Sequence, residues 1–179
     1  MYELFLLGKL MERPWHGYEF QQVLNAFVGP MRQVSWGTIY PMLRRLDEAG
    51  FISLEQTKGP RTDRRGRQKY SITAAGRQRF VGLMQSEQLN DANYRDTFRV
   101  MMGNFSRVEP ETRKAILERY LERLSAVEAH AVSMSERVQK APQLNEAERR
   151  DILLALDRDR FLADADRRWV TEHKFKLIR

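Results

Sequence analysis

A dense group of cations in the N-terminal half is the first feature of the sequence that points to chemistry. Five basic side chains fall within nine residues, namely Arg61, Arg64, Arg65, Arg67 and Lys69. Like charges in so short a segment repel one another, and contact with a phosphate backbone or a narrow minor groove relieves that repulsion. The group therefore predicts binding to nucleic acid, and the alternative is a solvated hairpin tip without a partner.

The segment before these cations, SWGTIYPMLRRLDEAGFI at residues 35–52, has the pattern of an amphipathic helix. Ser35 can cap its start, and Gly50 can supply the left-handed residue that ends it. At about 100° per residue, one face carries Ile39, Met42, Leu43 and Leu46. The opposite face carries Gly37, Pro41, Arg44 and Glu48. The first face is expected to pack, and the second is free to touch a partner.

Pro41 is unfavourable in such a helix because it removes a backbone hydrogen bond, at about 3 kcal/mol in an ordinary interior. Our hypothesis is that Gly37 and Pro41, which have little bulk, let the backbone approach a DNA groove closely. The major groove admits an α-helix whose first residues reach base edges. The residues expected to contact DNA are Ser35, Trp36, Thr38, Tyr40 and Arg44, followed by Arg64, Arg65, Arg67 and Lys69. Arg44 could contact guanine or phosphate, and Trp36 could instead pack on the preceding helix.

The elements that would position these residues can be read from periodicity. Two helices are predicted before the amphipathic segment, over residues 2–12 and 17–27, and another after it over residues 74–88, with Thr73 as its cap. Residues 51–56 and 68–73 alternate in part and predict two strands around the basic loop. The fold class is therefore mainly α, with an N-terminal winged helix-turn-helix and a small two-stranded β-wing.

Charge is unevenly distributed along the chain. Residues 1–80 carry 13 Lys and Arg against 7 Asp and Glu, whereas the remaining residues carry 18 against 17. A basic front half and a balanced rear half favour two domains with different partners. We expect a DNA-binding domain over residues 1–88 and a helical dimerisation and effector domain over residues 89–179.

Three motifs in the front half carry a specific resemblance: HGYEF at residues 16–20, GTIYPMLRRLDEAGFI at residues 37–52 and KYSITAAGR at residues 69–77. With the order of helices and hairpin, they resemble the PadR family of bacterial transcriptional regulators over residues 1 to about 85. The resemblance implies a winged helix-turn-helix that binds operator DNA as a homodimer, and a C-terminal helical part that holds the dimer together. In its length, the chain resembles the longer branch of the family, which contains phenolic-acid-responsive repressors.

The rear half predicts long helices and a self-associating surface. Residues 91–105 suit a short helix with a Met-rich face, which is either ordinary core or the lining of a site for an aromatic effector. Residues 110–140 and 145–176 suit long helices, and the first carries apolar residues in a heptad pattern. One thin hairpin is expected to be too small to bury them, so we expect a homodimer. Its predicted contacts are Leu117, Tyr120, Leu124, Val127, Met134, Leu156, Leu162 and Trp169.

Enzymatic and metal chemistry find little support. The three histidines, His16, His130 and His173, lie far apart, and the chain has no cysteine. The acidic residues at 157–166 interleave with arginines and lack the glycine of a calcium loop, so ion pairs are the simpler interpretation. No glycine-rich phosphate loop or nucleophile motif occurs. We expect no catalytic site, no metal and no cofactor.

The expected function is that of a cytoplasmic, sequence-specific repressor, released from its operator by a small effector of aromatic or phenolic character. The candidates for effector contact are His16, Tyr18, Phe98 and Trp169, and the alternative for His16 is a helix cap or a place in the core. Two alternatives are a protein-interaction module built on a winged-helix scaffold and a nonspecific DNA-binding protein. No segment reaches the roughly 18 apolar residues of a membrane span, so no membrane partner is expected.

Overall fold

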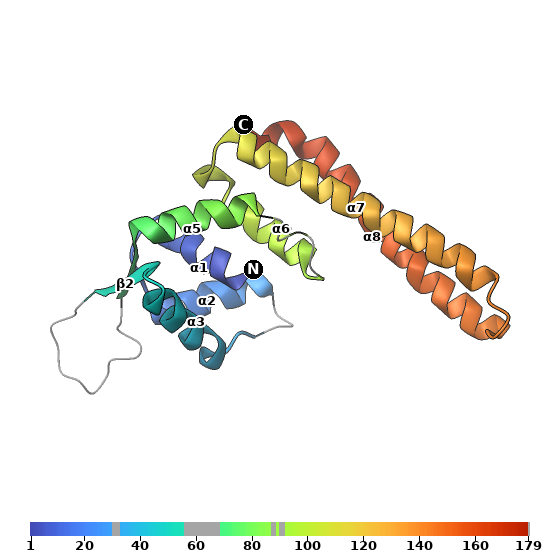
Figure 1. The fold of residues 1–179 in the computed structure, drawn as a ribbon, viewed down its shortest axis with the longest axis horizontal. Coiled ribbons are helices and arrows are strands. Elements are labelled where there is room, and N and C mark those ends of the chain that lie inside the picture. The colour runs from blue at the N-terminus through green and yellow to red at the C-terminus, as the bar shows by residue number, and fades with distance from the viewer. Residues whose placement is uncertain (30–32, 56–68, 87–88, 90–91, 179) are drawn as a thin grey trace. The chain divides into compact units, whose positions relative to one another are not determined.

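The structure is a computed structural model of the chain, and it describes residues 1–29, 33–55, 69–86, 89 and 92–178 (Figure 1). Two compact units are formed. Unit 1 consists of Met1–Gln88 and Arg99–Val108, and unit 2 consists of Leu89–Phe98 and Glu109–Arg179. None of the described helices combines the length and the apolar character that a membrane crossing requires.

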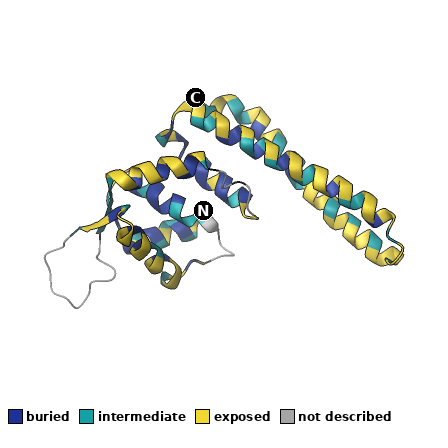
Figure 2. Ribbon diagram, in the orientation of Figure 1, coloured by how far each residue is buried: buried dark blue, intermediate teal, exposed yellow. Residues whose placement is uncertain are grey.

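Unit 1 contains the predicted winged helix-turn-helix, so the predicted fold class is confirmed. Its elements are α1 (Tyr2–Leu10), β1 (Trp15–His16), α2 (Gly17–Val28), α3 (Trp36–Glu48), β2 (Ile52–Glu55), β3 (Lys69–Ile72) and α5 (Ala74–Gln85). Helix α1 lies at the centre, because Leu4, Leu6 and Leu7 have no exposed surface (Figure 2). This burial agrees with a helix that is apolar almost all round.

The sheet has three strands rather than the two that were predicted. Its order is β1-β3-β2, with both pairs antiparallel. The additional strand pairs Trp15 with Tyr70 and His16 with Lys69. A two-residue strand shows no alternation in the sequence, and it forms only because the fold brings it beside β3.

Helix α3 begins and ends where its sequence indicates, but the predicted side-chain cap at its start is not made. Ser35 is the N-cap residue, yet its hydroxyl makes no capping hydrogen bond. Its carbonyl accepts from the N–H groups of Thr38 at 3.0 Å and Ile39 at 3.3 Å, as an N-cap carbonyl does at the start of a helix. At the other end, Gly50 has φ +71°, and the N–H of Phe51 donates to the carbonyl of Leu46 at 2.9 Å. This left-handed Schellman ending is the one that glycine permits.

Thr73 joins the end of α3 to the start of α5. Its hydroxyl oxygen accepts from the N–H of Gly76 at 3.0 Å, which confirms the predicted cap. The same hydroxyl donates to the carbonyl of Gly50 at 2.6 Å. Gly76 itself lies so close to the carbonyl of Phe51 that a Cβ there would approach the oxygen within 3.0 Å. The base of the wing is therefore anchored to the end of α3.

The remaining elements are α6 (Tyr94–Met102), the 3-10 helix η3 (Phe105–Arg107), α7 (Pro110–Gln139) and α8 (Glu146–Ile178). Helices α7 and α8 lie side by side and antiparallel (Figure 1). Helix α8 begins with a reciprocal capping box, in which the Asn145 side chain accepts from the Glu148 N–H at 2.9 Å. The Asn145 N–H in turn donates to the Glu148 carboxylate at 3.0 Å.

Candidate nucleic-acid interface

Helix α3 presents one packed face and one open face. Ile39, Leu43 and Leu46 are buried against unit 1, as predicted. The side chains expected to contact DNA lie mostly on the other face: Ser35, Thr38, Tyr40 and Arg44 are exposed, and Trp36 is half-buried. An exposed polar helix face of this kind has the size and shape that a major groove admits.

Pro41 lies inside α3 and is exposed, as is Gly37 four residues before it. Pro41 has no N–H to donate to the carbonyl of Gly37, so the missing hydrogen bond lies on the open face. The helix nevertheless continues to Glu48. The pair leaves a stretch of backbone with little side-chain cover on the open face of the helix.

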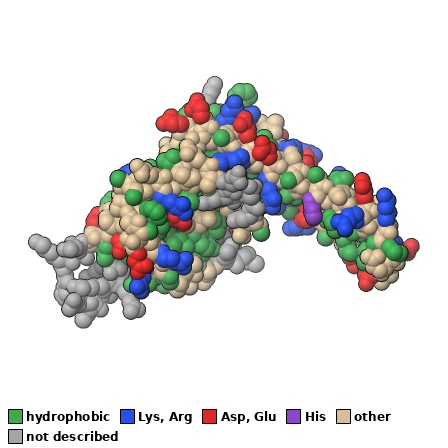
Figure 3. All heavy atoms as spheres, in the orientation of Figure 1, with side chains coloured by type: hydrophobic (Ala, Val, Ile, Leu, Met, Phe, Trp, Pro, Cys, Tyr) green, Lys and Arg blue, Asp and Glu red, His purple; other side chains and the backbone are tan. Residues whose placement is uncertain are grey.

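Charged side chains in the second half of α3 form an internal pair. The Nε of Arg44 donates to Oε1 of Glu48 at 2.7 Å, and both side chains are exposed. This hydrogen bond raises the pKa of the Arg44 guanidinium above its ordinary value. Figure 3 shows basic and acidic side chains interspersed over the described part of the visible face, rather than one continuous basic patch.

The segment leading into α3 is held by α2, which the sequence did not indicate. The N–H of Val34 donates to the Asn25 side chain at 2.6 Å, and the Gln21 side chain donates to the Val34 carbonyl at 3.3 Å. Amide side chains on a helix are usually solvated, so their spacing alone carried no signal. Here they set the position of the residue that comes two places before α3 begins.

At the base of the wing, Lys69 lies on β3 and is half-buried. Its ammonium lies 3.5 Å from the Glu55 carboxylate on β2, and the Ser71 hydroxyl donates to the same carboxylate at 2.6 Å. The bond from Ser71 and then the charge of Lys69 hold the pKa of Glu55 below its ordinary value, against the opposing effect of desolvation. Arg61, Arg64, Arg65 and Arg67 lie outside the described residues.

The residues named for effector contact occupy separate positions. His16 is the N-cap of α2, and its N–H donates to the Glu19 carboxylate at 2.6 Å. Tyr18 is exposed and stacks on His16 with ring centroids 5.6 Å apart. In unit 2, Phe98 is buried with one ring face covered by Tyr120, at a centroid distance of 3.7 Å.

Trp169, the remaining effector candidate, is partly exposed on α8 and stacks on His173, with ring centroids 4.8 Å apart.

The described residues of the two units contain no group of three or more His, Cys, Asp or Glu side chains that could hold a metal ion.

The apolar seam of α7 is already covered within one chain, which corrects the reason given for expecting a dimer. Leu117, Tyr120 and Leu124 are buried. Val127, Met134, Leu156 and Leu162 are half-buried, and Trp169 is the most exposed member of the set. Helices α6, α7 and α8 of one chain are therefore enough to bury three of these side chains and to cover four more in part, because each helix contributes apolar surface to the same core.

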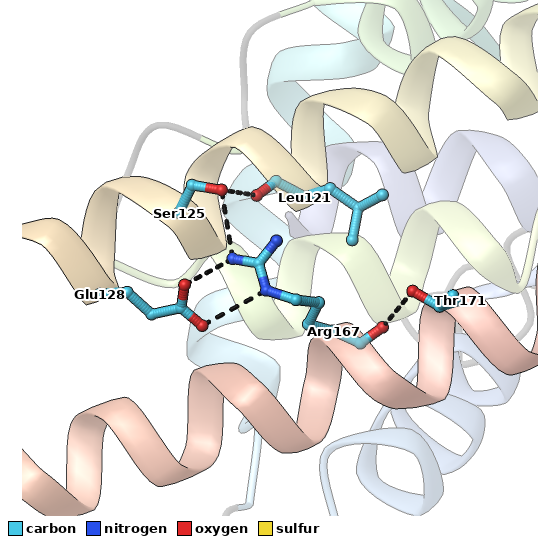
Figure 4. Close-up of polar contacts among 5 residues, drawn as sticks. All are labelled: Leu121, Ser125, Glu128, Arg167 and Thr171. Atoms are coloured by element: carbon cyan, nitrogen blue, oxygen red, sulfur yellow. Dashed lines mark hydrogen bonds and ion pairs between the residues drawn. The ribbon is translucent and has the colours of Figure 1, made fainter.

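Polar contacts register α7 against α8. Arg167 donates to the Glu128 carboxylate at 2.7 Å and to the Ser125 hydroxyl at 3.1 Å (Figure 4). Asp166 accepts from Arg95 on α6 at 2.7 Å and from the Tyr120 hydroxyl at 2.9 Å. The acidic residues of α8 that looked metal-like therefore serve in part as ion-pair partners.

Comparisons with known proteins agree with the winged fold of unit 1. Residues 6–81 match the model of the "Transcriptional regulator PadR-like family". No curated protein was found to match the chain.

Among solved structures, Bacillus subtilis PadR in complex with operator DNA is 17% identical and has a TM-score of 0.42, covering 95% of this chain and 94% of that one. The same protein in complex with p-coumaric acid is 17% identical with a TM-score of 0.42, covering 99% of this chain and 98% of that one. A PadR-like regulator from Bacillus cereus is 24% identical with a TM-score of 0.39, and covers 99% and 98%. Over residues 6–81, the chain is therefore similar to the PadR-like family of transcriptional regulators.

Proposed function

We propose that the protein is a sequence-specific DNA-binding repressor that acts as a homodimer. The observation that carries this proposal is the open face of α3, on which Thr38, Tyr40 and Arg44 stand exposed beside the low-bulk Gly37 and Pro41. This face belongs to a helix whose other side is anchored in unit 1, so its side chains are held in a defined arrangement. A rigid polar helix face is what direct readout of base edges requires.

Phosphate contacts would come from the wing. Lys69 lies at the described base of the wing. The sequence alone adds Arg64, Arg65 and Arg67 as expected contacts. Replacing these three arginines with alanine should flatten the dependence of log affinity on log salt by about 0.9 for each phosphate that the variant no longer neutralises. An unchanged slope would exclude the wing as a phosphate clamp.

The specific function is tested by selecting bound fragments from random duplex DNA. Enrichment of a palindrome with half-sites about one helical turn apart supports a dimeric, sequence-specific regulator. Binding without enrichment favours a nonspecific DNA-binding protein, and no binding at any salt concentration favours a protein-interaction module. Arg44→Ala should weaken binding to the enriched duplex, whereas Lys114→Ala in unit 2 removes the same charge and should have little effect.

The dimer proposal is supported by apolar side chains that the chain leaves open. On α8, Leu154, Phe161 and Phe175 are 61%, 70% and 83% exposed, respectively. They are separated by seven and fourteen residues, so they share one face of the helix. A second copy would cover this face, and exposed apolar surface of this kind is a common mark of an interface.

Phe161→Glu is the sharpest test of the dimer, because it introduces a charge at an exposed position and leaves the core of unit 2 intact. Light scattering at micromolar concentration should show a dimer for the unmodified chain and a monomer for this variant. Arg160→Gln, at an adjacent exposed position, lowers the net charge by the same one unit and is the matched control. A monomeric unmodified chain would refute the proposal and leave a palindromic operator unexplained.

The effector part of the proposal is a small aromatic or phenolic compound that releases the operator. It is supported by the family resemblance, and its candidate contacts, His16, Tyr18, Phe98 and Trp169, are predictions from the sequence that occupy separate positions. A ligand can release DNA only by its different affinity for two states of the protein. Titration with phenolic acids, followed by Trp fluorescence and by displacement of bound operator, tests this point. Absence of both signals would remove the effector and leave the DNA-binding function standing.

A further inference from the structure

Helix α3 as a whole carries no net charge, although unit 1 is basic in sequence. Its four charged side chains, Arg44, Arg45, Asp47 and Glu48, are all exposed and cancel one another. The part of the helix before them, Trp36–Leu43, contains no charged residue. Nonspecific DNA affinity comes from cations that neutralise phosphates, so this helix contributes little to it as it stands.

One of the two cations is also held in place. Arg44 donates through Nε to Glu48 four residues further along, at 2.7 Å. The bond draws the guanidinium toward the last turn of α3, away from the first residues of the helix. At 70% and 58% exposed, the two side chains form a surface pair that can be broken at small cost. Breaking such a pair changes an equilibrium by about twofold.

We propose that Glu48 is a specificity-determining residue that withholds Arg44 from phosphates on arbitrary DNA. This inference rests on the proposed DNA-binding function. A single phosphate contact offers Arg44 little more than Glu48 already provides. A guanine edge offers two hydrogen bonds in a fixed geometry, which is a stronger attraction than a surface ion pair. Arg44 therefore leaves Glu48 on a matching sequence and stays with it elsewhere.

Glu48→Gln is the test, because glutamine has the same shape but no charge. In this variant Arg44 is free to reach a phosphate on any sequence. Affinity for a scrambled duplex should rise about two- to threefold, and its salt slope should steepen by about 0.9, the value for one additional neutralised phosphate. Affinity for the enriched duplex should change less, because Arg44 already contacts a base there, so the ratio of the two affinities should fall.

Glu118→Gln is a matched control. Glu118 also pairs with a cation four residues away, Lys114, and the two side chains are 50% and 58% exposed on α7. Both substitutions raise the net charge from +7 by one. If Glu118→Gln changes the scrambled-duplex slope as much as Glu48→Gln does, the effect belongs to overall charge and the inference is overturned.

A variant that lacks Arg44 distinguishes two effects of the Glu48 carboxylate: holding the Arg44 guanidinium, and repelling DNA phosphates directly. With Arg44→Gln already present, Glu48→Gln should leave the slope unchanged, because no guanidinium remains to be released. An equal steepening in that background would show that the carboxylate only repels phosphate, and would overturn the proposal. If the unmodified protein binds no duplex at all, the proposed function itself fails. If the unmodified protein does bind DNA and Glu48→Gln and Glu118→Gln change the salt slope equally, only the proposed role of Glu48 is refuted.

Discussion

Replacing Gly76 with alanine adds one methyl group at the tightest backbone junction described in unit 1. The new Cβ would lie within 3.0 Å of both the Phe51 carbonyl oxygen and the Ile72 side chain. The carbonyl cannot easily move away, because it accepts from the N–H of Thr73 at 3.1 Å and from its hydroxyl at 3.1 Å. Either these bonds must lengthen or α5 must shift from the end of α3.

The free-energy change combines two opposing effects. Overpacking of a close-packed site costs about 1–3 kcal/mol. Alanine also favours helix over glycine by up to about 1 kcal/mol, and less in the first turn where Gly76 lies. We therefore expect a net destabilisation of about 1–2 kcal/mol. For a chain of this size that corresponds to a fall in Tm of roughly 2–8 °C.

Gly82 provides the control, because it lies in the same helix and no heavy atom stands within 4 Å of the position its Cβ would take. Gly82→Ala should stabilise the chain by about 0.5–1 kcal/mol through helix propensity alone. Thermal unfolding of both variants, followed by circular dichroism, should show shifts of opposite sign. Equal shifts of the same sign would show that close contact at Gly76 does not limit stability, and would refute the account of this junction.

Three other predictions follow from described contacts. Thr73→Val should lower the free energy of unfolding, measured by urea denaturation, by about 1–2 kcal/mol because it removes the cap of α5. Thr73→Ser should be nearly neutral, and equal losses would contradict a role for the hydroxyl. Burial raises the pKa of Tyr70 to about 12, so its stabilising contribution is complete below pH of about 10 and is lost as pH rises toward 12. Tyr70→Phe should lose less stability over that interval, and parallel pH profiles would refute this. Leu124→Ala should cost about 2–5 kcal/mol in unit 2 because Leu124 is fully buried, and Val132→Ala, at an exposed position on the same helix, should cost far less; similar costs would contradict the described packing.

Much of unit 1 could be predicted because its signals are local. The ends of α3 follow from Ser35 and Gly50, whose backbone preferences act within one turn. The cap of α5 follows from Thr73 for the same reason. The packing face of α3 follows from the spacing of its apolar residues, since a helix sets their angles. The domain division at residue 88, the DNA contacts and the effector contacts stay predictions.

Other features depend on partners distant in sequence. Strand β1 exists because β3 lies beside it, and its two residues give no periodic signal. The hydroxyl of Ser35 makes no capping hydrogen bond, although Ser35 is the N-cap residue of α3. The heptad pattern of α7 correctly indicated a buried seam but could not say which surface covers it.

By itself, the sequence determined the helices, the winged order of elements and the packing face of α3, because capping, periodicity and turn preferences act over a few residues. Only the tertiary structure decided that α6 and α8 of the same chain cover the seam of α7, so that the open apolar surface lies instead at Leu154, Phe161 and Phe175. The structure also shows Arg44 paired with Glu48 one turn further along α3, a local contact that the helical spacing allows but does not require. Periodicity identifies an apolar or charged face, but the partner of that face depends on packing and side-chain rotamers.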